Sequence, residues 1–155
     1  MYAMLATRPD IAFAVGTLSK HAATPGQEHM TALKHVYRYL RGTSDAHLVF
    51  RGDVKNELLG YIDADWAADI NDRRSVTGYV FILAGAAISW SSKKQSSVAL
   101  SSTEAEYMAA TAATKEAVWL HKLFDELHTV SSRPTMLLTD NQSAMALAKN
   151  AMFHD

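Results

Sequence analysis

The stretch "GYIDADWA", residues 60–67, decides how the rest of this chain is interpreted, because a run with a good strand pattern ends in two aspartates. Alternate side chains of a strand share a face, so Tyr61, Asp63 and Asp65 are expected on one side. A D-x-D pair alone is a weak signal for a site. Two explanations for Asp63 therefore stay open: it is a turn residue just past the strand end, or its carboxylate belongs to a site.

The residues around this stretch predict several strands followed by a helix, a strand and a helix. Short β-type runs separated by Gly, Asp and Asn indicate three or four antiparallel strands. They occur at residues 47–50, 57–63, 77–83 and 86–92. Helical spacing then covers residues 102–128, a strand pattern covers 135–140, and a second helical pattern covers 141–150.

The first fifty residues have a different pattern, which predicts a helical hairpin. Thr7 is expected to cap the first helix, with Pro9 in its first turn. Apolar residues then recur at helical spacing in two segments, and Gly42 is placed to end the second. Because the periodicity changes near residues 50–54, we place a domain junction there.

The composition limits the classes of function. The chain has 155 residues, 48% of them hydrophobic, which is enough for one core and a small satellite. It has no cysteine, so the available chemistry is that of carboxylate, histidine and hydroxyl groups. The net charge of −1 means that local basic patches must hold any polyanionic partner. No membrane-span or secretory pattern occurs, and we expect an intracellular protein without a membrane partner.

The long predicted helix separates its own acidic residues by face. Glu106 shares the apolar, small-residue side with Ala113 and is expected to point toward the sheet, whereas Glu104 lies on a mostly solvated side. Both acids also have capping-box spacing, with Thr103 before Glu106 and Ser101 before Glu104. A capping role for Glu106, which requires no metal, stays open at this point.

Asp140 presents a similar choice at the end of the strand predicted at residues 135–140. Alternation places Asp140 on one face with Met136 and Leu138. The alternative is that Asp140 or Asn141 simply caps the helix that follows.

The three acids together are more informative than each alone. If Asp63, Glu106 and Asp140 converge, their like charges disfavour ionisation unless a divalent cation compensates them. Oxygen ligands suit Mg²⁺ or Mn²⁺, and a pair of such ions clamps the attacking and leaving oxygens of a phosphodiester. The pattern therefore favours phosphodiester hydrolysis.

Long motif blocks of this chain closely resemble the ribonuclease H region of copia-type LTR retrotransposon polyproteins. The blocks are residues 61–120, which include "YIDADWAADINDRRSVTGYVF" and "SSTEAEYMAA", then "LLTDNQSAMALAKN" at 137–150 and "FHD" at 153–155. Residues 7–43 resemble the segment that joins the reverse transcriptase to that region. The resemblance covers nearly the whole chain.

The resemblance implies an α/β fold of the ribonuclease H type. The expected architecture is a mixed sheet of about five strands, the first three antiparallel, flanked by helices. Residues 1–50 would form a helical hairpin similar to the reverse transcriptase thumb or connection, and residues 54–155 a partial ribonuclease H-like domain.

The resemblance also implies endonucleolytic cutting of the RNA strand of an RNA/DNA hybrid. The acid of "YID" is Asp63, the acid before "YMAA" is Glu106 and the acid of "LLTD" is Asp140; these would be the catalytic metal ligands for two Mg²⁺ or Mn²⁺ ions. The order Asp, Glu, Asp along the chain fits ribonuclease H, whereas related integrases have the order Asp, Asp, Glu. No Tyr-x-Asp-Asp polymerase signature is found.

The expected partners are an RNA/DNA hybrid and the rest of the reverse transcriptase polyprotein, in the cytoplasm, a virus-like particle or the nucleus. A hybrid displays 2′-hydroxyls in a wide minor groove, and phosphate contacts supply affinity. Our candidates for nucleic-acid binding are Arg73, Arg74, Lys93, Lys94 and Gln95. The alternative for the two basic pairs, residues 73–74 and 93–94, is that they lie in ordinary solvated turns. Trp66 and Trp90 are either stacking surfaces for the hybrid or core residues.

One departure from the family pattern affects the expected activity. In the family the "FH" block is followed by a basic segment, a further strand and a terminal helix with a fourth metal-binding acid, whereas this sequence stops at Asp155. We therefore expect a partial site. Three alternatives stay open: a ribonuclease H, a non-catalytic nucleic-acid- or partner-binding remnant with the same fold, and a structural fragment whose acids are caps.

Overall fold

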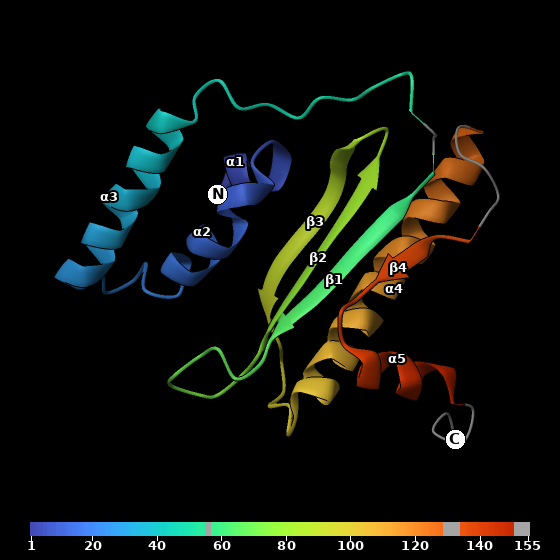
Figure 1. The fold of residues 1–155 in the computed structure, drawn as a ribbon. Coiled ribbons are helices and arrows are strands. Elements are labelled where there is room, and N and C mark those ends of the chain that lie inside the picture. Colours follow the sequence, from blue (N-terminus) through green and yellow to red (C-terminus); the bar gives the residue numbers. More distant parts are fainter. Residues whose placement is uncertain (55–56, 129–133, 151–155) are drawn as a thin grey trace. The chain divides into compact units, whose positions relative to one another are not determined.

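The computed structural model describes residues 1–54, 57–128 and 134–150. The chain divides into two compact units, Met1–Val49 and Phe50–Asp155, hereafter the first and second units. Figure 1 shows the first unit as helices in blue and cyan, and the second as a sheet with helices α4 and α5. The "FHD" block falls outside the described residues.

The first unit is helical. It contains α1 (Tyr2–Ala6), η1 (Pro9–Ile11), α2 (Ala12–Ser19) and α3 (Gln27–Gly42). Pro9 begins η1 and Gly42 is the last residue of α3, as the sequence patterns indicate. The capping role predicted for Thr7 is wrong. Its hydroxyl donates to the Ala3 carbonyl at 3.4 Å, because Thr7 ends α1, a helix that the apolar spacing did not predict.

A polar network joins the start of η1 to the end of α3. The Arg8 guanidinium donates to the Asp10 carboxylate at 2.8 Å and to the Thr43 carbonyl at 3.2 Å. The Tyr39 hydroxyl also donates to Asp10 at 2.8 Å, and its ring lies 5.6 Å from the Arg8 guanidinium carbon. Since α3 has no buried residue, these directional contacts supply much of the link between the two helices.

The second unit is built on a four-stranded sheet in the order β3-β2-β1-β4. The strands are β1 (Leu59–Asp65), β2 (Val76–Leu83), β3 (Ala86–Lys94) and β4 (Met136–Leu138). The first three strands pair antiparallel, as expected, and β4 pairs parallel with β1. The described residues thus form four strands where the resemblance implied about five.

The prediction of a strand at residues 47–50 is wrong. This segment has a β-type composition but pairs with no described strand, and Val49 and Phe50 are about half exposed. The boundary between the two units falls between these two residues. The β-propensity of a short run does not produce a strand without a neighbouring ladder.

The connections between the strands follow from their directions. The antiparallel strands β2 and β3 are joined by Ala84 and Gly85, whose φ angles of +52° and +82° suit a tight two-residue hairpin turn. The parallel strand β4 requires a crossover, and α4 (Ser102–Leu127) supplies it. In Figure 1, α4 lies along one face of the sheet.

The core of the second unit lies between α4 and the sheet. Ala109, Ala113 and Ala117 of α4 pack against Ile62 of β1 and Phe81 of β2. These small residues follow each other at helical spacing and allow the helix backbone to approach the strands closely. The core contacts confirm the predicted apolar face of α4. Although α4 has 26 residues, no described helix has both the length and the apolar character that crossing a membrane requires.

Gly60 lies in this core at a position that has no room for a side chain. A Cβ atom at Gly60 would lie 2.6 Å from Leu137 Cδ2 and 2.8 Å from Phe81 Cε1. Because the Phe81 ring is fully buried, it cannot move away freely. We expect Gly60→Ala to lower the free energy of unfolding by about 1–3 kcal/mol, the usual cost of overpacking. Urea unfolding measures the change.

Gly52→Ala is the matched control in the same unit, since an added Cβ there meets nothing within 4 Å. It should leave stability close to that of the wild type. Equal stability of the two variants would contradict the packing argument.

Candidate metal centre

Asp63 and Asp140 lie side by side because of the register between β1 and β4. The last parallel pair is Tyr61 with Leu138, and each aspartate lies two residues beyond its member of that pair. Equal offsets on neighbouring parallel strands place two side chains on the same face. Asp63 also pairs with Gly78 of β2, so it belongs to the strand and is not a turn residue.

Asp140 is not the cap of the helix that follows. The side chain of Asn141 caps α5 (Gln142–Lys149) by accepting a hydrogen bond from the Ala144 backbone N–H at 2.9 Å. The choice left open between Asp140 and Asn141 is thereby resolved. The Asp140 carboxylate is available at the end of β4.

Glu106 is likewise not needed to cap α4. Ser101 accepts from the Glu104 backbone N–H at 3.1 Å, and the Glu104 carboxylate accepts from the Leu100 backbone N–H at 2.7 Å. The capping arrangement therefore uses Glu104. Glu106 lies on the inner face of the helix and is only 6% exposed.

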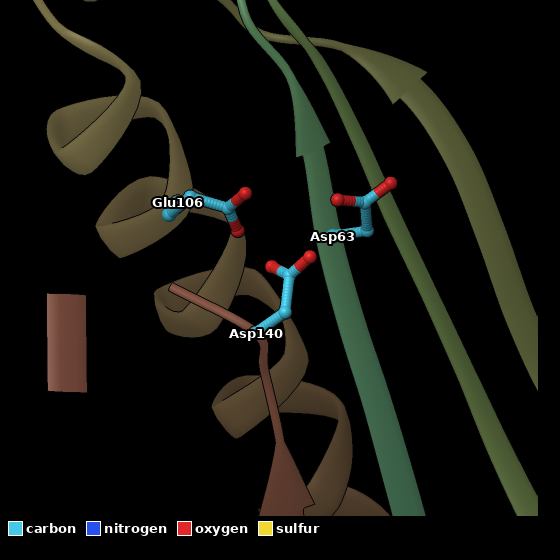
Figure 2. Close-up of side chains that lie close together, drawn as sticks. All are labelled: Asp63, Glu106 and Asp140. Atoms are coloured by element: carbon cyan, nitrogen blue, oxygen red, sulfur yellow. The ribbon is translucent and has the colours of Figure 1, made fainter. Parts of the chain in front are cut away.

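The structure brings the three predicted acids together. Asp63, Glu106 and Asp140 each offer a carboxylate oxygen, and these oxygens lie within 4.8 Å of one another. Figure 2 shows Glu106 pointing from α4 toward β1, with the Asp140 side chain between Glu106 and Asp63. The two aspartates are exposed and the glutamate is buried. A ligand from solvent thus meets the aspartates on the open side of the cluster.

The electrostatics of the cluster centre on Glu106. Burial raises the pKa of the Glu106 carboxyl, and the negative charges of Asp63 and Asp140 raise it further. A hydrogen bond from the Ala64 backbone opposes these effects. Among the described residues, no basic side chain forms an ion pair with the three acids, and the buried Oε2 of Glu106 has no hydrogen-bond partner.

These features fit a divalent cation. All the donor atoms are carboxylate oxygens, which are the ligands that Mg²⁺ and Mn²⁺ prefer. Oxygens on opposite sides of one Mg²⁺ are about 4 Å apart, close to the span of this cluster. A cation would also give the unpaired Glu106 oxygen a partner and offset the repulsion among the acids.

The basic candidates fall into two groups. Arg73 is exposed in the loop between β1 and β2, and Lys93 is exposed near the end of β3. In contrast, the Lys94 ammonium donates to Asp69 at 3.0 Å and to Asp72 at 2.8 Å. These contacts raise the pKa of Lys94, chiefly through the hydrogen bond to Asp72. Lys94 therefore serves to hold this loop.

Arg74 belongs with Lys94 rather than with the exposed pair. Its Nε lies 3.6 Å from the Asp72 carboxylate, and the residue is partly buried. Arg73 and Lys93 thus remain the two candidates whose charges face solvent.

Gln95, predicted as a candidate for nucleic-acid binding, is buried in the structure. Its side chain is 7% exposed, and its amide nitrogen donates to Thr77 Oγ1 at 3.0 Å and to the Ala105 carbonyl at 2.9 Å. The residue follows a basic pair, which suggested a surface position, but the chain turns inward directly after β3. No local sequence signal marks that turn.

The sequence did not predict two contacts near the cluster, because backbone groups take part in them. The Ala64 backbone interacts with the Glu106 carboxyl and lowers its pKa, and the Ala99 carbonyl accepts from the Trp66 indole N–H at 3.1 Å. A backbone group leaves no residue-type signal in a sequence. Trp66 stays 48% exposed with its polar atom satisfied, and Trp90 is partly buried in β3.

The fold and the site together define a mixed α/β protein with a carboxylate cluster suited to a divalent cation. The chain is 51% identical over 154 residues to the retrovirus-related Pol polyprotein from transposon TNT 1-94 of Nicotiana tabacum, a match that covers 99% of the chain and 11% of the polyprotein. It is 43% identical over 148 residues to the Pol polyprotein from transposon RE2 of Arabidopsis thaliana, covering 96% of the chain and 10% of the polyprotein.

The chain belongs to the copia-type retrotransposon Pol polyprotein family. It spans about a tenth of the length of these polyproteins. It is also 56% identical over 120 residues to secreted RxLR effector protein 161 of Plasmopara viticola, a match that covers 77% of the chain and 84% of that protein. No protein-family model and no solved structure match the chain.

Glu106 should make the stability of the cation-free protein depend on pH. Because its pKa is raised in the folded state, the folded protein keeps a proton on Glu106 that the unfolded chain has already released. As pH rises from the ordinary glutamate range through the raised pKa, the wild type should therefore lose stability relative to Glu106→Gln. Chemical unfolding of both proteins in a chelating buffer at several pH values measures this difference.

An added divalent cation should then stabilise the wild type at neutral pH more than it stabilises Glu106→Gln. Parallel pH profiles for the two cation-free proteins would contradict the electrostatic argument.

Proposed function

We propose that the second unit is the ribonuclease H region of a retrotransposon reverse transcriptase polyprotein, which hydrolyses the RNA strand of RNA/DNA hybrids with Mg²⁺ or Mn²⁺. The observation that carries the proposal is the convergence of three carboxylate oxygens within 4.8 Å from two strand ends and one helix. Membership of the retrotransposon Pol family supplies the biological setting.

The order of the acids along the chain supports a nuclease of this type. Asp63, Glu106 and Asp140 follow the order Asp, Glu, Asp that the sequence resemblance associates with ribonuclease H. The order Asp, Asp, Glu of the related integrases does not fit. The alternative in which these acids act only as helix caps is also disfavoured, since Ser101, Glu104 and Asn141 make the caps.

Each acid has a distinct part in the proposed reaction. Asp63 and Asp140 present exposed oxygens toward the substrate phosphate, and Glu106 completes the ligand set from the buried side. Bound Mg²⁺ or Mn²⁺ supplies an activated water and stabilises the departing 3′-oxygen. The rigid strands and the packed face of α4 keep the carboxylates in place and thereby orient the scissile phosphate.

The exposed cations near the sheet are suited to hold the hybrid. Arg73 and Lys93 offer charge to phosphates without an ion pair among the described residues. Trp66 directly follows Asp65, the last residue of β1, and offers an apolar surface that is about half exposed. Contacts to 2′-hydroxyls would distinguish the RNA strand from DNA.

Substitution of the acids tests the catalytic proposal. Asp63→Asn, Glu106→Gln and Asp140→Asn should each lower Mg²⁺-dependent cleavage of a labelled hybrid by more than about 100-fold, because changes in outer-shell residues alone cost 10- to 100-fold. Asp65→Asn is the matched control: it lies on the same strand and face as Asp63 but outside the cluster. It should cleave at a rate close to that of the wild type.

The same assay separates the proposal from its alternative. Hybrid binding without cleavage by the wild type would favour a non-catalytic binding module. Cleavage that survives all three substitutions would contradict the assignment of the site.

Salt dependence tests the role of the exposed cations. Arg73→Ala and Lys93→Ala should each weaken hybrid binding and reduce the magnitude of the slope of log affinity against log salt by about 1, the effect of losing one phosphate contact. Lys94→Ala is the contrast, because Lys94 pairs with Asp69 and Asp72. Its slope should match that of the wild type. Fluorescence anisotropy with a labelled hybrid measures all four proteins.

A further inference from the structure

Gln95 occupies a buried position between the sheet and the first turn of α4. It directly follows β3, and its backbone N–H donates to the Ser75 carbonyl at 2.8 Å, which extends the ladder between β2 and β3 by one residue. Its side chain then turns inward and is 7% exposed.

The Gln95 amide links two elements that the site requires. Its Nε2 donates to Thr77 Oγ1 on β2 at 3.0 Å and to the Ala105 carbonyl of α4 at 2.9 Å. Ala105 is fully buried and immediately precedes Glu106. A single neutral group therefore fixes the start of α4 to the sheet, next to the buried acid.

The sheet provides a second connection between Gln95 and Glu106. Thr77 pairs with Ala64 of β1 in the strand register. The Ala64 backbone in turn interacts with the Glu106 carboxyl and lowers its pKa. Gln95 is thus connected to Glu106 in two ways. On α4 the connection runs through Ala105, and in the sheet it runs through Thr77 and Ala64. These contacts bring α4, β1, β2 and the end of β3 together at one place.

Only one end of the Gln95 amide is satisfied. The Oε1 atom is buried and has no hydrogen-bond partner among the described residues, which costs free energy. The two hydrogen bonds that Nε2 donates to Thr77 and Ala105 oppose this cost. The donor end of the amide is therefore the part that links α4 to the sheet.

We propose that Gln95 is a positioning residue that holds the Glu106 carboxylate against Asp63 and Asp140. Like charges in the cation-free cluster push Glu106 away from the two aspartates, and the amide link to Ala105 resists that movement. Metal–ligand distances tolerate changes of only about 0.2 Å, so a small shift of α4 would spoil the ligand set. The consequence for cation binding rests on the proposed function, whereas the positioning of Glu106 does not.

Gln95→Met tests the proposal, because methionine has a similar length and no N–H donor. In the cation-free protein, the Ala64 amide proton resonance should shift from its wild-type position as the Glu106 carboxyl moves away from the Ala64 backbone. In a Mn²⁺ titration, affinity should fall about 10- to 100-fold, the usual effect of losing an outer-shell partner. NMR and calorimetry provide the two measurements.

Leu120→Ala is the control for a general loss of stability. Leu120 is 2% exposed and belongs to the same core, but it lies more than three turns further along α4. This variant should unfold more easily while keeping the Ala64 resonance and the Mn²⁺ affinity of the wild type. Thr77→Val provides a second test, since it removes the other acceptor of the Gln95 amide with little change of volume. It should shift both readouts in the same direction as Gln95→Met.

The outcomes separate this inference from the proposed function. An unchanged Ala64 resonance in Gln95→Met and Thr77→Val would overturn the positioning role. A loss of Mn²⁺ affinity no greater than that of Leu120→Ala would also overturn it. If the wild type binds no Mn²⁺, the proposed function fails, and the Ala64 resonance alone decides whether Gln95 positions Glu106.

Discussion

The parallel pairing of β1 with β4 is the constraint on which the candidate site depends. Only three residue pairs form it, yet they determine that Asp63 and Asp140 emerge side by side on the same face. A parallel neighbour requires a crossover, and the crossover is α4, whose alanine face packs on the sheet and carries Glu106 to the strand ends. Strand register and helix packing thus bring together three like charges that would repel one another in the absence of a compensating cation.

Much of this arrangement could be predicted from the sequence because it follows from periodicity. Helical spacing separated Glu106 from Glu104, and the structure places Glu106 in the core and Glu104 at the helix start. The choice between Asp140 and Asn141 as a cap could not be made from spacing, since either residue type caps a helix well. The folded chain decides it, because the Asn141 side chain accepts the hydrogen bond from the Ala144 backbone N–H.

The incorrect predictions share one physical cause. A local sequence pattern does not show which residues a segment contacts in the folded chain. Residues 47–50 have strand composition but no ladder, and Thr7 follows a short helix that has no buried residue. Lys93, Lys94 and Gln95 are adjacent in the sequence and were all candidates for nucleic-acid binding. Instead, Lys94 holds a loop through two aspartates and Gln95 enters the core. Long polar side chains have enough reach that their neighbours in space, not in sequence, determine their roles.

The burial of Glu106 beside two exposed aspartates also affects how the site would respond to its surroundings. A carboxyl group whose ionisation is disfavoured must give up its proton before it can coordinate a metal. At a pH where Glu106 still holds its proton, occupation of the site would release that proton into the solution, and the apparent binding heat would change with the ionisation enthalpy of the buffer. Acidity of the medium and cation loading would be coupled through one side chain.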